Sequence, residues 1–305
     1  MNWSSNENIK LIYRLLRVKG YGPVQVNKLL FANNSSTINT DELEERIKRG
    51  LTPSENEEFS RDFELYQDES GAVSYMSIMD DSIYPKELLN LLSRRAPSIL
   101  SYMGNIALLR KKKIAFSGSR RASEKGLWIT KDCIDQLASI NDICIVSGYA
   151  AGIDTIAHYE ALTKGASTII ILPEGISHFT IRKELKPVWD WSRVLVISEF
   201  FPSDKWLEGR AMQRNHTIIG ISDAVVVVEA GETGGSMATG VETLKAGKML
   251  YVPKYASAPE SALGNERLLH NGAHPLARSP KTNRTNIEKM ITELNHHSGQ
   301  YTLFG

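Results

Sequence analysis

The sequence predicts an α/β fold, in which a doubly wound, mostly parallel Rossmann-like sheet follows a small N-terminal helical domain. From residue 114 to residue 273, short runs rich in Ile and Val alternate with amphipathic stretches. These runs show almost no polar alternation, as expected of strands that are covered by helices on both faces. Several runs end in Gly and Ser directly before a helical stretch, which is typical of strand–turn–helix units.

Six parallel strands with intervening helices are expected in this region. The expected strands are 114–117, 143–147, 168–172, 194–198, 224–229 and 249–252. The expected helices are 123–139, 152–164, 177–190, 210–221, 235–247 and 264–271. Because parallel strands end at the same edge of a sheet, the loops that follow them are expected to form the binding surface.

The remaining chain divides into three parts. We expect a helical domain over residues 1–70, a connector over 71–112, and a short helix with a flexible tail over 276–305, after the sheet domain of 113–275. The tail is expected because residues 295–299 are polar and turn-prone. The turn at Gly20–Pro23 resembles a helix–hairpin–helix, which can present N–H groups to a DNA phosphate, and the alternative is a tight turn in a small helical bundle.

Composition indicates an ordinary soluble protein. The chain has 305 residues, 42% of them hydrophobic and 23% charged, and its net charge is +1, so a nucleic-acid partner must be held by a local patch. Cys133 and Cys144 are expected as reduced core residues, and no Cys/His spacing indicates a metal or another cofactor. The N-terminus does not resemble a signal peptide and no apolar run is long enough to span a bilayer, so we expect a cytoplasmic protein without membrane contact.

Two consecutive strand–turn–helix units over Lys113–Asp154 predict an anion site. Such turns leave backbone N–H groups unpaired at the start of a helix, where the helix dipole also favours negative charge. The residues of the two turns are Gly118, Ser119, Arg120 and Arg121 in the first, and Ser147, Gly148 and Gly152 in the second.

Other cations and Gly-rich turns fall at the same predicted edge. Single-stranded nucleic acid requires positive charge for its backbone and planar groups for its bases. The further candidates for nucleic-acid binding are Arg182, Lys183, Arg214, Asn215, Gly234, Gly235 and Ser236.

The same residues favour binding over catalysis. Asp154 and His158 share a helix face, but no nucleophile stands beside them, so we expect Asp154 to cap its turn and His158 to hydrogen-bond within the domain. No catalytic residue is therefore expected. As an alternative, residues 232–242 resemble the Gly-rich loop of nucleotide phosphoribohydrolases, in which a Glu does the chemistry, and Glu242 would be that residue.

Ordered motifs at the strand ends resemble the DNA-processing protein A family, also called DprA or Smf. The motifs are Gly118-Ser119-Arg120, Ser147–His158, Arg214–Ser222, Val228–Ser236 and Gly264–Ala273. The resemblance covers about residues 75–275 and implies a protein that binds single-stranded DNA. It also implies dimerisation through the sheet domain and transfer of the strand to a RecA-type recombinase in recombination and natural transformation.

The chain departs from the family pattern at a few positions, such as His216, where a second Arg is usual, and Lys254, where Gly is usual. A regulatory, antitoxin-type partner in a bacterial phage-defence module is an alternative within the same family. For the homodimer, Val194–Ile197, Val225–Val228 and the helices around them are expected to supply apolar surface.

The C-terminus carries a second possible binding motif. Gln300, Leu303 and Phe304 resemble the short peptide by which polymerases and repair proteins bind the replicative sliding clamp. Leu303 and Phe304 would fill an apolar pocket and Gln300 would hydrogen-bond at its rim. The alternative is that the tail folds back and buries Phe304 in a groove of the sheet domain.

Overall fold

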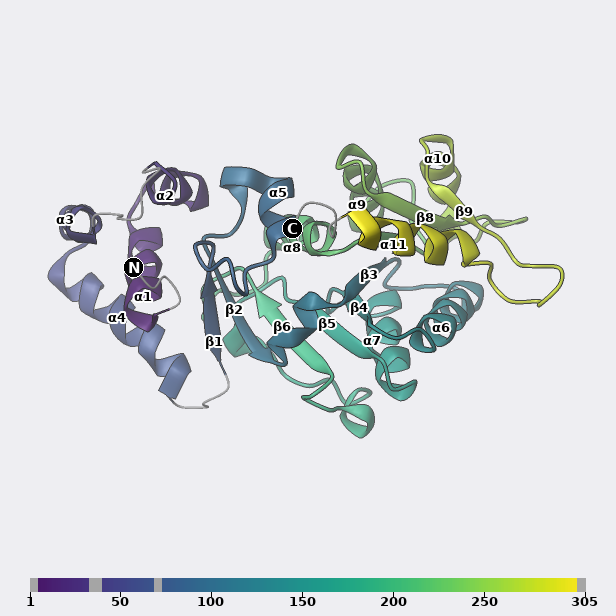
Figure 1. Cartoon of the computed structure of the whole chain (residues 1–305), viewed down its shortest axis with the longest axis horizontal. Coiled ribbons are helices and arrows are strands. Elements are labelled where there is room, and N and C mark those ends of the chain that lie inside the picture. Colours follow the sequence, from purple (N-terminus) through teal and green to yellow (C-terminus); the bar gives the residue numbers. More distant parts are fainter. Residues whose placement is uncertain (1–4, 33–39, 69–72, 301–305) are drawn as a thin grey trace.

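The structure, a computed structural model of the chain, describes residues 5–32, 40–68 and 73–300. Figure 1 shows a group of helices at the N-terminal end beside a twisted sheet that has helices on both faces. Within the described residues one nine-stranded sheet has the order β1-β2-β6-β5-β4-β3-β7-β8-β9. β1 pairs antiparallel with β2, and β2 pairs antiparallel with β6. All the remaining neighbouring strands pair in parallel.

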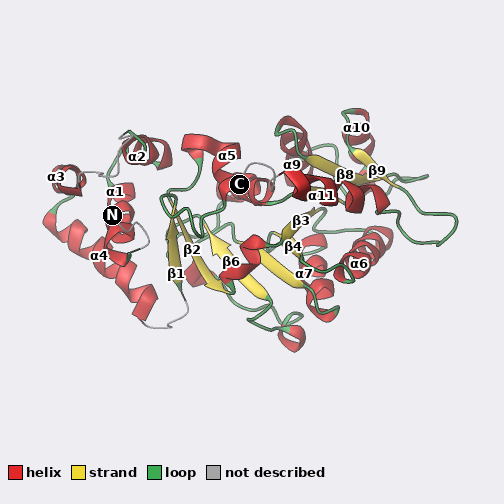
Figure 2. Cartoon of the chain, in the orientation of Figure 1, coloured by secondary structure: helices red, strands yellow, loops and turns green. Residues whose placement is uncertain are grey.

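The six expected strands are all present and all parallel, which confirms the Rossmann-like core (Figure 2). They are β3 (Lys112–Ser117), β4 (Ile143–Ser147), β5 (Ser167–Ile171), β6 (Val194–Ser198), β7 (Ala224–Val227) and β8 (Met249–Pro253). Three further strands extend the sheet: β1 (Ser74–Ser77), β2 (Ile99–Gly104) and β9 (His274–Leu276). The expected connector therefore contributes β1 and β2 to the same sheet.

Helices cover both faces of the sheet. One face carries α5 (Lys86–Leu92), α8 (Glu208–Ile221), α9 (Gly235–Lys245) and α10 (Asn265–His270), and the other carries α6 (Glu124–Ala138), α7 (Ile153–Thr163) and α11 (Glu288–Gln300). Along β3, Ala115 packs into the first core, whereas Ile114 and Phe116 pack into the second. Burial on both faces explains why the strands are apolar throughout.

The N-terminal helices are α1 (Asn6–Arg17), α2 (Pro23–Leu30), α3 (Thr40–Gly50) and α4 (Pro53–Asp68). They share a core with the sheet, because Tyr13 of α1 and Phe63 of α4 pack against Tyr75 of β1, and Tyr13 also contacts the Phe201 ring. In the turn between α1 and α2, Gly20 has a φ of 87°, which glycine adopts readily.

The expected helix over 177–190 is wrong. The segment holds only two short 3-10 turns, Ile176–His178 and Lys186–Val188. Pro187 lacks an N–H group and disfavours a helical conformation for Lys186, so the segment cannot sustain an α-helix there.

The C-terminal segment also differs from expectation. Residues 295–299, expected to be turn-prone, belong to α11, which continues through Gln300. Ile287, just before the helix, and Met290 and Leu294 within it are buried in the core beside α6. Their spacing places them on one apolar face, which fixes the helix on the sheet. Leu303 and Phe304 lie outside the described residues.

The apolar strands do not offer the expected dimer surface. Val194–Ile197 and Val225–Val228 are completely buried within the sheet layers. A surface for self-association must therefore come from other residues. None of the helices in the described part of the chain has the length and apolarity needed to cross a membrane.

Candidate nucleic-acid interface

A cavity of about 440 Å³ lies at the carboxyl edge of the sheet, where the strand order reverses. β3 lies between β4 and β7. The chain leaves β3 on the β4 side and leaves β7 on the opposite side, so the loops that follow these two strands diverge. Crevices of this kind are the usual ligand sites of doubly wound sheets. The expected binding residues that line the cavity are Gly118, Ser119, Arg120, Gly148, Arg214, Asn215, Gly235 and Ser236.

Two helices begin at this cavity with a glycine at the N-cap. Gly152 precedes α7 with a φ of 76°, and Gly234 precedes α9 with a φ of 97°, and neither N-cap residue makes a side-chain capping hydrogen bond. Asp154 of α7 and Ser236 of α9 line the cavity, so the first turns of both helices border it. The N–H groups and dipoles of these turns favour an anionic ligand.

Gly148 and Gly152 permit close approach of the chain below the cavity. A Cβ atom at Gly148 would lie 2.5 Å from both Nη1 of Arg214 and Oδ2 of Asp154, and one at Gly152 would lie 2.3 Å from the carbonyl oxygen of Ser119. A larger residue at Gly152 would push the first and second turns apart, and one at Gly148 would displace the side chains of Arg214 and Asp154. Gly152 therefore lets the two turns lie together, and Gly148 leaves room for the Arg214 and Asp154 side chains below the cavity.

The arginines of the site differ in environment. Arg120 and Arg121 are exposed on the turn after β3, and Arg120 lines the cavity. Arg214 is only 6% exposed, and its Nη1 donates to the carbonyl oxygen of Ile171 at 2.5 Å. Burial lowers the pKa of Arg214, an effect opposed by the charges of Asp154 and Glu199. Arg214 therefore builds the floor of the cavity, whereas Arg120 presents its charge to solvent.

Asp154 and His158 take the structural roles expected of them. Oδ2 of Asp154 accepts a hydrogen bond from the N–H of Ala150 at 3.2 Å, which fixes the turn before α7. Nδ1 of the buried His158 lies 2.7 Å from Oγ1 of Thr168, and Nε2 lies 2.6 Å from the carbonyl oxygen of Gly148. Burial lowers the pKa of His158 to about 4, so the ring is neutral near neutral pH.

Six expected binding residues are not part of the cavity lining, namely Arg121, Ser147, Gly152, Arg182, Lys183 and Gly234. Ser147 is fully buried and donates to the carbonyl oxygen of Phe116 at 2.6 Å, so it joins β4 to β3 instead of facing a ligand. Arg182 donates to the carbonyl oxygen of Tyr149 and lies over the Tyr149 ring, with Cζ 4.7 Å from its centre. Lys183 is exposed beside it. This segment extends the positive charge past the cavity rim.

Glu229, at the end of β7, fixes three loops of the site. It is fully buried and accepts hydrogen bonds from the N–H of Ser123 at 2.9 Å, from Oγ of Ser261 at 2.7 Å and from the Tyr255 hydroxyl at 3.2 Å. From the sequence, Glu229 could be placed in a motif, but no role could be given to it. Its donors come from distant segments, so no local pattern could identify it.

Trp206 and Met212 line the cavity and were missed by the sequence reasoning. Their exposed fractions are 47% and 40%, which is high for large apolar side chains. Trp206 precedes α8 and Met212 lies within it. A Trp close before the Arg214-Asn215 pair is the only sequence signal that could have indicated them, and it is weak. Together they supply the planar and apolar surface on which a base can stack.

The alternative enzymatic residue, Glu242, does not line the cavity. It lies in the later turns of α9 and pairs with Lys245 at 2.8 Å. Among the described residues, no cluster of His, Cys, Asp and Glu has the arrangement of a metal site. Burial raises the pKa of Cys133 and of Cys144 to about 12, so both thiols stay protonated as core groups.

Comparison with known proteins gives one consistent family. The family model of DNA recombination-mediator protein A matches residues 75–291. DNA processing protein DprA of Streptococcus pneumoniae (strain R6) is 34% identical over 199 residues, which are 65% of this chain and 68% of that protein. DNA processing protein DprA of Bacillus subtilis (strain 168) is 28% identical over 213 residues, covering 68% of this chain and 67% of that protein.

Solved structures agree with the sequence relatives. The X-ray structure of DNA processing protein A from Streptococcus pneumoniae aligns with a TM-score of 0.70 at 28% identity, over 89% of this chain and 94% of that one. A structure of DNA processing protein A from Helicobacter pylori, whose title describes a single-stranded DNA binding mode, aligns with a TM-score of 0.59 at 27% identity, over 74% and 96%. The chain therefore belongs to the DNA recombination-mediator protein A family, whose members include the DNA processing proteins described above.

Proposed function

We propose that this chain binds single-stranded DNA in the cavity at the carboxyl edge of the sheet. The observation that carries the proposal is the combination of the exposed Arg120, the glycine-capped starts of α7 and α9, and the exposed Trp206 around one cavity. The Arg120 cation and the N-termini of the two helices can bind a phosphate, and the Trp206 indole can stack on an unstacked base. Single strands present both groups at once, whereas a duplex keeps its bases stacked inside.

The family supports the same ligand. The structure of the Helicobacter pylori relative is described as revealing a single-stranded DNA binding mode, and the cavity of this chain contains the Gly118-Ser119-Arg120 motif. We further propose that the bound strand passes to a RecA-type recombinase during recombination or DNA uptake. The alternative is that the same binding activity serves a regulatory, antitoxin-type role in a bacterial phage-defence module.

Two assembly proposals accompany this function. The chain forms a homodimer through surface outside β6 and β7, because both strands are buried. The C-terminal Gln300, Leu303 and Phe304 bind the sliding clamp, with Gln300 at the end of α11 leading into residues that lie outside the described part. Light scattering at micromolar concentration tests the homodimer, and a single subunit mass there removes it.

The binding proposal is tested by titrating labelled oligothymidylate and a duplex of equal length at several salt concentrations. We expect preference for the single strand and an affinity that falls steeply with salt, because phosphate contacts release counterions. Arg120→Ala and Trp206→Ala should each weaken binding, while Lys48→Ala on α3 serves as an exposed control. Equal affinity for duplex and single strand, or no effect of Arg120→Ala, would contradict the proposal.

A further inference from the structure

A second positively charged groove lies beside the first turns of α6. This groove, which we call the α6 groove, has a volume of about 470 Å³ and is lined by Lys125, Trp128, Lys254 and Arg278, with Ile129 and Leu276 beneath them. Lys125, Lys254 and Arg278 are exposed. Among the described residues, none of these three cations takes part in an ion pair, and no carboxylate lines the groove.

An exposed indole lies among these cations. Trp128 is 42% exposed, and Cζ of Arg278 lies 5.6 Å from the centre of its ring. Nζ of Lys125 lies 5.1 Å from the centre of the Tyr255 ring. Aromatic faces together with cations form the chemistry by which proteins hold unpaired bases and their phosphates.

The α6 groove lies beside the candidate cavity. Ser123 is the N-cap of α6 and follows the turn that carries Arg120, and Lys125 lies in the first turn of the same helix. Tyr255 links the two sites, since its hydroxyl donates to Glu229, which lines the cavity, while its ring faces Lys125. The exposed cations Arg120, Arg121, Lys125, Lys254 and Arg278 therefore follow one side of the carboxyl edge of the sheet.

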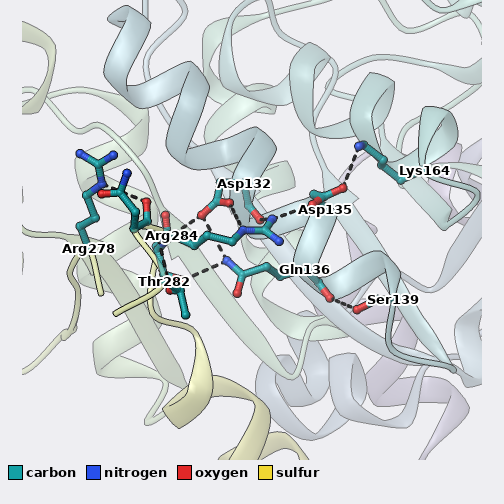
Figure 3. Close-up of polar contacts among 10 residues, drawn as sticks. Asp132, Asp135, Gln136, Ser139, Lys164, Arg278, Thr282 and Arg284 are labelled. Carbon is teal, nitrogen blue, oxygen red and sulfur yellow. Dashed lines mark hydrogen bonds and ion pairs between the residues drawn. The ribbon is translucent and has the colours of Figure 1, made fainter. Parts of the chain in front are cut away.

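A network of ion pairs fixes the wall that carries Arg278. Residues 277–286 form a loop closed by the bridge between Arg278 and Thr285. Nε of Arg284 donates to Asp132 at 2.6 Å and Nη2 donates to Asp135 at 2.6 Å, which ties this loop to α6 (Figure 3). Arg278 takes no part in these pairs, so its charge stays available to the groove.

The position of Lys125 in the first turn of α6 indicates which kind of ligand the groove binds. A cation in the first turn of a helix is repelled by the positive end of the helix dipole. The same position is favourable when an anion lies between the lysine and the helix start. The cations of the groove, which have no ion-pair partner among the described residues, thus favour a polyanion over an acidic or apolar protein segment, for which Trp128 would need a matching apolar anchor.

From this arrangement we infer that a single-stranded nucleic acid leaving the candidate cavity continues into the α6 groove, where Lys125, Lys254 and Arg278 contact phosphates and Trp128 stacks on a base. The inference rests on the proposed function, because it extends the strand that the cavity holds. It assigns the α6 groove to strands that are longer than the cavity can accommodate.

The test compares labelled oligothymidylates of six and twenty nucleotides. In the Lys125→Gln/Lys254→Gln/Arg278→Gln variant, we expect 10- to 100-fold weaker binding of the 20-mer and less than a twofold change for the 6-mer. The slope of log K against log salt for the 20-mer should fall by about 2, since each lost phosphate contact on a single strand contributes about 0.7. The matched control is Lys48→Gln/Arg49→Gln/Arg61→Gln, which removes the same charge from exposed residues of α3 and α4 and should leave both affinities unchanged.

Trp128→Phe gives an independent readout. The 20-mer should quench more tryptophan fluorescence in the unmodified protein than in this variant, and the 6-mer should quench both equally. The inference is overturned if the triple substitution leaves the 20-mer affinity unchanged. It is also overturned if the 6-mer loses as much affinity as the 20-mer, or if the control variant loses as much affinity as the triple variant. None of these outcomes contradicts binding in the cavity itself. Failure of the unmodified protein to bind either oligonucleotide overturns the proposed function as well.

Discussion

Glu229 and Ser123 join the end of β7 to the start of α6: the Glu229 carboxylate accepts hydrogen bonds from both the N–H and the hydroxyl of Ser123. Ser123 also caps α6, with its Oγ 3.1 Å from the N–H of Gly126. The two residues are 106 positions apart in the sequence. Their contact fixes the two sides of the crevice in which the cavity lies.

Replacing this carboxylate should loosen both the fold and the site. We expect Glu229→Gln to lower the free energy of unfolding by about 1–3 kcal/mol, because an amide cannot accept all the buried donors that face it. Urea unfolding measures this, and the same variant should bind single-stranded DNA more weakly. Glu232→Gln, at an exposed position of the next loop, is the control and should change neither quantity.

Arg120 and Arg214 should separate binding from stability. Arg120→Ala is expected to cost about 1–3 kcal/mol of DNA affinity, the size of a lost charged hydrogen bond, without changing the thermal midpoint. Arg214→Ala should lower the midpoint as well, because it leaves the carbonyl oxygen of Ile171 and the nearby carboxylates without their buried partner. Thermal unfolding and fluorescence anisotropy on the same samples decide this, and equal midpoints for the two variants would contradict the buried role of Arg214.

His158 should make stability depend on pH. Its pKa is about 4 in the folded chain, against about 6.5 in an unfolded one, so the unfolded state binds more protons between these values. Stability from this residue is complete above pH 6.5 and falls by up to about 3 kcal/mol as the pH drops toward 4. His158→Gln removes this contribution, so urea unfolding at pH 7 and pH 4.5 should differ less in the variant. An unchanged difference would show that another group titrates.

The packing of α11 should contribute to the stability of the whole sheet. Met290 is completely buried beside α6, so Met290→Ala should reduce the free energy of unfolding by about 2–5 kcal/mol through lost burial and a cavity. Thr292→Ala, on the exposed side of the same helix, should have little effect. Denaturant unfolding distinguishes the two, and similar small losses would mean that α11 is not tied to the core.

The C-terminal motif has its own test. A labelled peptide of residues 295–305 should bind a purified sliding clamp, with Leu303 and Phe304 as the apolar anchors. The peptide with Leu303→Ala and Phe304→Ala is the control and should not bind. Absence of saturable binding below roughly 100 μM, equivalent to about −5.5 kcal/mol, would remove this proposal.

The sequence by itself determined the six parallel strands and the edge at which the site lies. Runs such as Ile143–Val146 are apolar on both faces, as expected of a strand that lies between two helix layers. The glycines that follow β3 and β4 mark turns that local backbone geometry demands, so their place at the cavity could be predicted. Asp154 and His158 were assigned structural roles for a similar local reason, since they share one helix face.

Only the tertiary structure decided which of the expected residues face the ligand. Arg120 and Arg214 both stand in motifs, yet one is exposed and the other lies under Gly148, because the packing of α8 against β5 is set by distant contacts. The same holds for α11. Its polar end is turn-prone by sequence, but it is helical because Met290 and Leu294 are buried in the core beside α6. Burial and electrostatic partners depend on segments that are far apart along the chain, and no local pattern encodes them.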